Sequence, residues 1–453
     1  MPRTSMLYLR PSLLLIGLLG FFSGLPLALT ASTLTAWLAE SSIDRTAIGL
    51  FAAVATPYAF KFLWAPLMDG VRLPILARLG RRRSWLLLTQ MLLVAGIVAM
   101  SLTNPASAVQ LTALAAVLIA TASASQDIVI DAYRVERLST EEQGAGAAMA
   151  TFGYRMGMLV SGAGALYLAD QFSWQVTYSI MAAIMALSLL VTLFAKEPTN
   201  AMVRAEKKSL RQFIKGNVIE PFTDFMTRPQ WAAVLAFVIL YKLGDAFLGA
   251  MFNPFLLDIG FTKTQIAQIV KLYGLLATLG GVFLGGLLVA RMGMYGALML
   301  TGFAHMCTNL LLIVQAQLGA NEQFLILSIT SENLTGGMST AAFIAYLSAL
   351  CKLRYTATQY ALVSSFAAFG RTWLSTPSGW VSVQFGWEIF FAISCVISLP
   401  SLALLYWLEN QKRKEVLGAS TSTLYSHFAS GGSDIKIASG LPPVISPKRV
   451  PRS

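Results

Sequence analysis

Apolar runs of about 20 residues, the length that crosses a bilayer as a helix, recur along this 453-residue chain from end to end. A hydrophobic content of 56% against 12% charged residues, with a mean hydropathy of +0.65, leaves too much apolar surface for a water-soluble protein. The sequence therefore predicts an all-α integral membrane protein with twelve transmembrane helices. We place the spans at 12–38, 47–68, 85–103, 107–131, 144–168, 175–195, 230–257, 265–289, 295–315, 323–350, 358–382 and 387–408.

Cationic residues between the spans predict the orientation of the chain in the membrane. The side that holds both ends of the chain is rich in Lys and Arg, including the 196–229 segment, whereas the other side has only Arg45 and Lys263. By the positive-inside rule, both termini are expected to face the cytoplasm. The net charge of +12 then reflects topology and not a nucleic-acid partner. A bacterial inner membrane is the expected location.

The sequence offers no motif for an enzyme, a cofactor or a metal. The three cysteines, Cys307, Cys351 and Cys395, lie in or beside apolar stretches without C-x-x-C spacing. No phosphate-binding loop, H-E-x-x-H or G-x-S-x-G motif occurs. We therefore expect no catalytic activity, with an ion gradient as the driving force for any transport.

Short segments repeat at a steady offset across the two halves of the chain. Residues 45–48 resemble 263–266, Gln143 matches Gln359, and Arg155 matches Arg371, at offsets of 216 to 218. Such a parallel repeat of six spans is the arrangement of the major facilitator superfamily fold, in which two bundles rock around a central site. The expected domains are bundles at 1–195 and 230–408, a cytoplasmic linker at 196–229 and a disordered cytoplasmic tail at 409–453.

Charged residues inside the spans are the strongest candidates for a transport site, because each costs about 2.5–3.5 kcal/mol at mid-helix on insertion scales. Five are cations and three are carboxylates, an excess that favours an anionic substrate. They are Lys61, Asp127, Arg155, Lys242, Asp245, Lys271, Glu332 and Arg371.

The three carboxylates are candidates for proton coupling, because desolvation moves a carboxyl pKa towards neutrality. Asp127 shares a helical face with Asp131 and has no acidic counterpart in the second half. Asp245 follows Lys242 at i+3, where a plain ion pair is an equally good interpretation. Glu332 has no basic neighbour in its own helix and needs a partner from another span, or a proton. His305, single and mid-span, is expected to be a hydrogen-bonded interior residue.

Candidate substrate contacts come from several spans. Ser23, Thr30 and Trp37 lie on one stripe of the first span and would suit a sugar, although such hydroxyls more often bond to backbone. The other candidates are the cations Lys61, Arg155, Lys242, Lys271 and Arg371, which could hold a carboxylate or serve as structural counter-charges.

The loop after the second span predicts a cytoplasmic gate. Asp69, followed by the basic run that begins at Arg81, resembles the signature between spans two and three of major facilitators. Asp131 and Arg134 lie at the corresponding end of the fourth span, where we expect them to act in the same gate or to form structural ion pairs.

Longer segments then resemble the AmpG family of muropeptide permeases. The likeness is dense in the first half, at residues 22–30, 60–69, 80–83, 123–134 and 144–155, and thinner beyond residue 230. Gln126, inside one of these segments, becomes a further candidate substrate contact. The resemblance implies proton-driven import of anhydromuropeptides, which are sugar-peptides released by cell-wall turnover, for peptidoglycan recycling and, in some bacteria, β-lactamase induction.

Other functions stay open from the sequence. A permease of the same fold for another anionic metabolite, such as acetyl-CoA or a sugar acid, is the first alternative, and a drug exporter is the second. A transporter-like sensor that moves nothing is a third. We expect a monomer that contacts lipid and a small-molecule substrate.

Overall fold

The computed structural model describes residues 7–43, 51–74, 76–198, 212, 215–262, 265–374 and 377–429, and every regular element in them is a helix. Residues Met1–Tyr406 form one compact unit and Trp407–Ser453 a second. The candidate site described below lies within the first unit. The predicted linker and tail, and the loop cations Arg45 and Lys263, fall partly or wholly outside the described residues.

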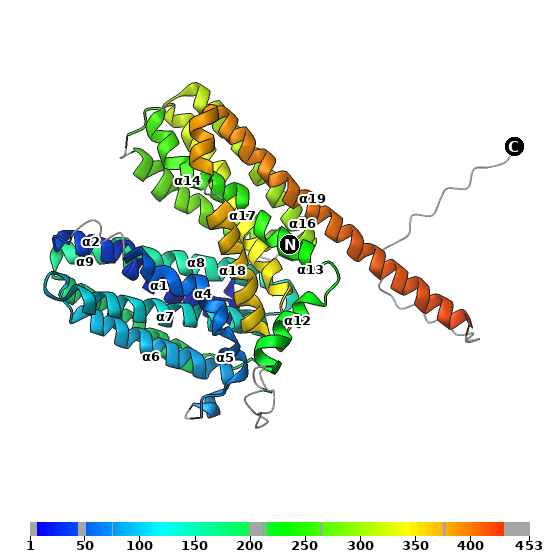
Figure 1. Cartoon of the computed structure of the whole chain (residues 1–453), viewed down its shortest axis with the longest axis horizontal. Coiled ribbons are helices and arrows are strands. Elements are labelled where there is room, and N and C mark those ends of the chain that lie inside the picture. Colours follow the sequence, from blue (N-terminus) through cyan, green and yellow to red (C-terminus); the bar gives the residue numbers. More distant parts are fainter. Residues whose placement is uncertain are drawn as a thin grey trace. The chain divides into compact units, whose positions relative to one another are not determined.

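Helices follow one another closely along the chain (Figure 1). The first half contains η1 (Leu7–Leu9), α1 (Pro11–Thr30), α2 (Ser32–Glu40), η2 (Phe51–Ala55), α4 (Thr56–Phe60), η3 (Lys61–Leu63), α5 (Ala65–Gly70), η4 (Ala77–Leu79), α6 (Arg81–Ser101), α7 (Pro105–Arg137), η5 (Thr140–Glu142), α8 (Gln143–Leu159), η6 (Val160–Gly164), α9 (Ala165–Gln171) and α10 (Trp174–Phe194). The remainder contains η8 (Lys215–Ile219), α12 (Glu220–Met226), α13 (Trp231–Leu240), α14 (Leu243–Asp258), η9 (Ile266–Tyr273), α16 (Gly274–Leu318), α17 (Glu322–Ala349), α18 (Thr356–Leu374) and α19 (Ser378–Ala429).

Every predicted span overlaps one of these helices or a short run of them. Among the described residues, seven stretches are long and apolar enough to cross a membrane, judged by length and composition. They cover eight of the predicted spans, because the stretch 268–318 contains two. The spans expected at 47–68, 144–168, 323–350 and 358–382 lie on helices that do not meet that criterion. The count of twelve crossings stays a prediction.

Glycines in left-handed conformation separate helices that otherwise run together. Within α16, Gly293 has a φ of 77°, and within α19, Gly386 has a φ of 74°. Such values are readily adopted by glycine, which has no Cβ. Gly293 thus divides the eighth and ninth predicted spans, and Gly386 precedes the twelfth.

The structure repeats local details at the offset seen in the sequence. Asn104 caps the start of α7, and Asn321, 217 positions later, caps the start of α17. The indole nitrogen of Trp174 donates to Glu40 at 2.9 Å, and that of Trp387 donates to Asp258 at 3.1 Å. Side chains that make the same contact in each half support a duplicated unit.

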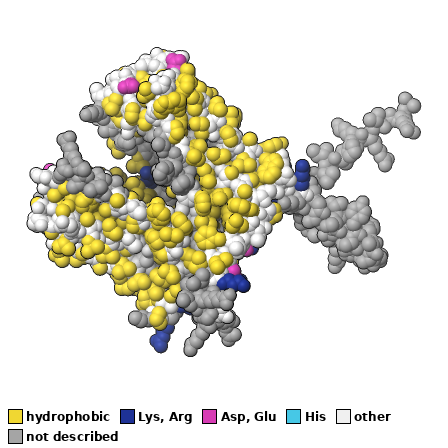
Figure 2. Space-filling model, in the orientation of Figure 1, with side chains coloured by type: hydrophobic (Ala, Val, Ile, Leu, Met, Phe, Trp, Pro, Cys, Tyr) yellow, Lys and Arg dark blue, Asp and Glu magenta, His cyan; other side chains and the backbone are white. Residues whose placement is uncertain are grey.

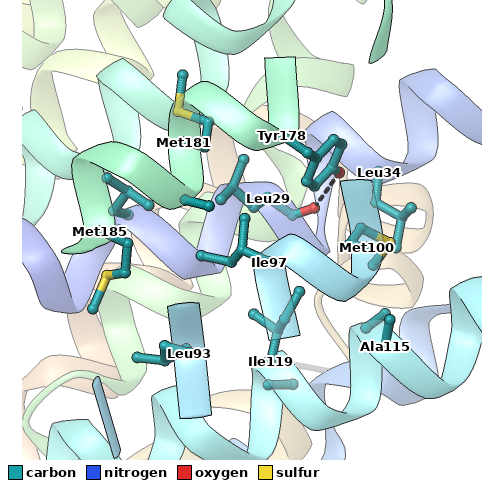
Figure 3. Packing of buried hydrophobic residues seen from close by; sticks show 14 of the residues in the cluster. Leu29, Leu34, Leu93, Ile97, Met100, Ala115, Ile119, Tyr178, Met181 and Met185 are labelled. Atoms are coloured by element: carbon teal, nitrogen blue, oxygen red, sulfur yellow. Dashed lines mark hydrogen bonds between the residues drawn. The ribbon is translucent and has the colours of Figure 1, made fainter. Parts of the chain in front are cut away.

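A buried apolar core holds the first bundle together. Leu29 and Leu34 of the first span pack with Leu93, Ile97 and other residues of α6, α7 and α10 (Figure 3). In the same cluster Tyr178 is fully buried, and its hydroxyl donates to the Leu29 carbonyl at 2.8 Å. This bond satisfies a polar group that lies among apolar side chains.

Small residues bring α1 and α8 close together (Figure 1). A Cβ added at Gly24 would lie 2.0 Å from the Tyr154 carbonyl oxygen, and one at Gly153 would lie 1.9 Å from the Gly17 carbonyl oxygen. Larger side chains at these positions would force the helices apart. Glycines of the first span therefore form the face that packs against α8.

The outer surface is strongly apolar. Figure 2 shows hydrophobic side chains over much of the visible face, with few charged groups among them. Large exposed side chains such as Leu111, Leu114 and Leu327 belong to long helices. A soluble protein would rarely expose so much apolar area, whereas lipid would cover it.

The start of the tail differs from the prediction of disorder. The helix α19 continues through Ala429, about 20 residues beyond the predicted start of the tail at residue 409. An ion pair one turn apart, Arg413 to Glu409 at 2.6 Å, supports its continuation. The prolines that suggested disorder all lie in residues 430–453, outside the described residues.

Candidate functional site

A break in the seventh predicted span creates the first polar cluster. Tyr241 and Lys242 lie between α13 and α14, and Lys242 has φ −102° and ψ 8°, outside helical geometry. The Lys242 Nζ donates to Asp245 Oδ2 at 2.8 Å and to Ser339 Oγ at 3.1 Å. Broken helices at bilayer depth are typical of binding and coupling sites in transporters.

The same aspartate has a second basic partner on another helix. Asp245 Oδ1 lies 2.7 Å from His305 Nε2, on α16. The other ring nitrogen, Nδ1, lies 3.0 Å from Thr335 Oγ1, on α17. Glu332, one turn before Thr335, interacts electrostatically with both His305 and Asp245. We call Lys242, Asp245, His305 and Glu332 the second-half cluster.

This cluster confirms the predicted proximity of Lys242 and Asp245. Glu332 lies near enough to His305 and Asp245 to interact electrostatically, but among the described residues its carboxylate forms no ion pair, so the partner that the sequence led us to expect stays a prediction. The sequence did not predict that His305 belongs to this cluster and pairs with Asp245. Its interior position and satisfied hydrogen bonds agree with the sequence interpretation, but its contact with Asp245 does not follow from spacing, because 60 positions separate the two residues.

In the first half, Asp127 has a different environment. Its Oδ1 accepts a hydrogen bond from Ser23 Oγ at 2.5 Å, joining α7 to α1. Lys61, at the start of η3, is close enough to attract it electrostatically. The structure thus brings together three residues that the sequence had singled out separately.

Buried polar groups lie near this aspartate along α7. Gln126 Nε2 donates to the Phe22 carbonyl at 2.9 Å, but its Oε1 is buried and has no partner within the described residues. The hydroxyls of Ser123, on the same helix, and Tyr58, on α4, are near enough to bond to each other, and among the described residues neither has another hydrogen-bond partner. Unsatisfied buried polar atoms are costly and are tolerated chiefly where function needs them.

Two first-span candidates have packing roles in this structure. Thr30 donates to the Pro26 carbonyl at 3.1 Å, the backbone bond that the alternative interpretation expected. The Trp37 ring is 3% exposed, with its centroid 5.8 Å from that of Trp174 in a stacked arrangement. Neither side chain is free to contact a sugar here, because local backbone bonding and core packing already engage them.

Three cationic candidates are not placed in either group. Arg155 is exposed on α8 and, among the described residues, has no ion pair. The side chains of Lys271 and Arg371 lie outside the described part of the structure. Their substrate roles stay predictions.

The predicted gate residues meet at one end of the helices, together with an arginine and a glutamate that sequence reasoning missed. Asp69 Oδ1 lies 2.7 Å from Arg82 Nη2, and the same guanidinium lies 2.5 Å from Glu136. Arg81, the predicted partner, contacts the Asp69 carbonyl at 2.9 Å and Glu136 at 3.2 Å. Arg82 is therefore the arginine that pairs with the Asp69 carboxylate, because it points inward and is fully buried.

Contacts between the two halves occur at this same end. Asp69 Oδ2 accepts from the Thr358 amide and hydroxyl, both at 2.8 Å, at the start of α18. Arg134 donates to Ser348 Oγ at 2.9 Å and to the Tyr360 hydroxyl at 3.1 Å. Asp131, 3.6 Å from Arg134, supports it from the same helix. The gate residues thus hold the halves together.

The connection between the halves is also bound here. Asp224, on α12, pairs with Lys352 and with Arg228, and Gln359 donates to it. Partial burial would raise the pKa of Asp224, but the hydrogen bonds from Lys352, Gln359 and Arg228 hold it below its ordinary value. Gln359, singled out by the repeat, anchors α18 to this connection.

Comparison with known proteins identifies close sequence relatives and the same fold. A model of the Major Facilitator Superfamily matches residues 16–373. The anhydromuropeptide permease of Escherichia coli (strain K12) is 42% identical over 402 residues, covering 87% of this chain and 79% of the relative. The proton:xylose symporter XylE superposes with a TM-score of 0.66 at 13% identity, covering 89% and 96%. The human organic anion transporter MFSD10 gives a TM-score of 0.56 at 18% identity, covering 89% and 100%.

Proposed function

Since this chain belongs to the major facilitator superfamily and, within it, to the anhydromuropeptide permease family, we propose that it imports anhydromuropeptides with the proton gradient. It is a multi-pass membrane protein of a transporter family, not an enzyme. The substrates would be GlcNAc-1,6-anhydroMurNAc and its peptides, carried from the periplasm to the cytoplasm across the bacterial inner membrane. Import would serve peptidoglycan recycling and, in some bacteria, β-lactamase induction.

One observation carries this proposal. The 42% identity to the Escherichia coli permease extends over 402 residues and 87% of this chain, so it must reach both halves and not the gate alone. A shared gate would account for a local likeness, whereas likeness over such a length supports a shared substrate class. The solved structures, at 13% and 18% identity, support the fold only.

The finer topology belongs to the same proposal. We propose twelve spans with both termini in the cytoplasm, bundles at 1–195 and 230–408 joined by a linker at 196–229, a tail at 409–453, and a monomeric state. The repeated Trp–carboxylate contacts support the division into two bundles. The basic residues around Arg82 and Arg134 support a cytoplasmic location for the gate.

Cations in the first half favour an acidic substrate. Lys61 lies near Asp127, and Arg155 is exposed; neither forms an ion pair with another described residue. A muropeptide carries carboxylates and sugar hydroxyls, which suit cations and the unsatisfied Oε1 of Gln126. Asp127, Asp245 and Glu332 would exchange the coupled protons. The same cations leave another anionic metabolite as the second candidate.

The gate residues indicate how import would be controlled. With Asp69 and Arg134 bonded across the halves, the cytoplasmic end is closed. Rocking of the bundles would break these bonds and open the site to the cytoplasm. The proton and the substrate would then be released on the same side.

Uptake into membrane vesicles tests the proposal. Labelled GlcNAc-1,6-anhydroMurNAc should accumulate when a proton gradient, acidic outside, is imposed, and absence of uptake would reject the substrate. Uptake that survives collapse of the gradient would reject the coupling but keep the permease.

Asp127→Asn gives the first residue-level prediction. Accumulation should fall at least ~10-fold, a change of about 1.4 kcal/mol, because the amide cannot exchange the proton. Protein in the membrane should stay at the level of the unaltered chain. Loss of folded protein would instead assign Asp127 a structural role.

A further inference from the structure

His305 has contacts on both of its ring nitrogens in the interior of the second half. Its side chain is 7% exposed, with Nε2 at 2.7 Å from Asp245 Oδ1 and Nδ1 at 3.0 Å from Thr335 Oγ1. A neutral imidazole has one donor nitrogen and one acceptor nitrogen. The partners of the two nitrogens therefore determine where the protons are.

The Thr335 hydroxyl acts as an acceptor towards His305. Its Oγ1 lies 2.7 Å from the Ser331 carbonyl, shorter than its 3.0 Å contact with Nδ1. A hydroxyl has one proton, so Thr335 that donates to the carbonyl can only accept from Nδ1. Nδ1 then carries a hydrogen.

The 2.7 Å contact with Asp245 needs a second proton. An ionised carboxylate only accepts, so a hydrogen must lie on Nε2, or on Asp245 Oδ1 itself. In either arrangement, the pair holds one proton more than a neutral histidine beside a carboxylate would hold. This count follows from the distances alone.

The surrounding charges favour that extra proton. Lys242 lies 2.8 Å from the other Asp245 oxygen, and Glu332 of α17 interacts electrostatically with His305. The remaining titratable neighbour, Tyr241, is held by Ser339 and Thr301. With Glu332 ionised, a protonated His305 lets two cations balance two carboxylates; without that proton, one negative charge is left uncompensated in a poorly solvated interior.

We infer that the His305–Asp245 pair carries one of the transported protons, with the Thr335 hydroxyl switching between two hydrogen bonds. On release, the N–H bond at Nδ1 breaks, the proton passes to water, and the Thr335 hydroxyl turns from the Ser331 carbonyl to donate to Nδ1. A protonated pair leaves the cluster neutral and so tolerates an anionic substrate, whereas the deprotonated cluster repels it. This assignment depends on the proposed proton-coupled import.

The chain contains two histidines, His305 and His427, which allows a direct test. In the full-length His427→Gln protein, ¹⁵N-labelled imidazole signals come from His305 alone. At pH 7 both nitrogens should show proton-bearing shifts, or one shared with the carboxylate, and Nδ1 should lose its proton on alkalinisation. A ring whose Nδ1 carries no proton at any pH between 6 and 8 would overturn the inference, whatever the substrate, because His305 would then be a plain neutral histidine that donates from Nε2 to Asp245.

Transport separates this inference from the proposed function. His305→Gln should lower gradient-driven accumulation of GlcNAc-1,6-anhydroMurNAc at least ~10-fold, while exchange of labelled for unlabelled substrate stays within about 2-fold and becomes less dependent on pH. Accumulation equal to that of the unaltered protein would overturn the inference and leave the permease intact. Failure of the unaltered protein to transport would reject the proposed function instead.

If His305→Gln does not fold, a second pair of variants tests whether the Thr335 hydroxyl acts as the switch. Thr335→Val removes the switching hydroxyl but keeps the histidine and the aspartate, and it should also lower accumulation at least ~10-fold. Thr340→Val is the matched control, because Thr340 lies on the same helix, donates at 2.8 Å to the Gly336 carbonyl and, among the described residues, forms no hydrogen bond with His305 or Thr335. Equal accumulation by the two variants would overturn the role of the switch.

Discussion

The two halves share a duplicated helical scaffold, but their buried aspartates, Asp127 and Asp245, have different hydrogen-bond and ion-pair partners. Asp245 of the second half lies between two basic side chains, Lys242 at 2.8 Å and His305 at 2.7 Å. Asp127 of the first half has a hydroxyl partner, Ser23, and a more distant attraction to Lys61. The helices and the contacts at their ends are repeated in the two halves, whereas the arrangement of buried charges differs between the two bundles.

This difference suggests that the two aspartates have different roles in transport. A carboxylate paired on both oxygens is held in place and exchanges protons through its partners. A carboxylate with one hydroxyl partner can change its protonation with little rearrangement, and it is available to a ligand. The predictions below test whether the two aspartates really differ in this way.

The largest expected effect is on the second half. Asp245→Asn leaves Lys242 and His305 without their anion, and we expect a loss of about 3 kcal/mol in the free energy of unfolding. Asp127→Asn should cost under about 1 kcal/mol, because an amide can still accept from Ser23. Unfolding in an SDS titration measures both. Equal losses would show that the two sites are energetically alike.

A smaller effect is expected from the hydroxyl partners. Ser23→Ala removes the one hydroxyl donor to Asp127 and should cost about 2 kcal/mol. Ser339→Ala removes one of two partners of Lys242 and should cost about 1 kcal/mol, because Asp245 still holds the ammonium. The same titration compares them, with Ser179→Ala on the exposed face of α10 as the control. The reverse order would contradict the proposed difference.

The smallest loss in the free energy of unfolding is expected at the Trp–carboxylate contacts that both halves share. Trp174→Phe and Trp387→Phe each remove one indole bond to a carboxylate at a helix end. We expect about 1 kcal/mol for the buried Trp174 contact and about 0.5 kcal/mol for the more exposed Trp387 contact. A large loss at either position would indicate that the duplicated scaffold is not equivalent between the halves.

Sequence patterns predicted the features that depend on local spacing. Helix positions, the repeat, and the Lys242–Asp245 pair followed from hydropathy and from i to i+3 spacing. The choice of Arg82 over Arg81 did not, because both arginines are buried and only packing decides which guanidinium reaches the Asp69 carboxylate. Glu136 was missed because it lies off the helical face that Asp127 and Asp131 share.

Long-range contacts could not be predicted, because no periodicity relates distant residues. The Asp245–His305 contact joins two helices, and Asp69 reaches α18 from the other half of the chain. The break at Lys242 was also missed, since the apolar run from Trp231 to Leu240 resumes in α14 after a short polar interruption, and Gly244 near the junction was not taken as a helix break. Such breaks are stabilised by tertiary contacts to the freed polar groups.

The bonds that cross between the halves share a property that bears on turnover rate. Each charged group at that boundary keeps a partner in its own half: Asp69 has Arg82, and Arg134 has Asp131. When the boundary separates, neither charge is left bare, and the neutral partners Thr358, Ser348 and Tyr360 can be rehydrated. The separation therefore avoids the energetic penalty of an isolated charge, which should keep its kinetic barrier low and make it reversible many times over.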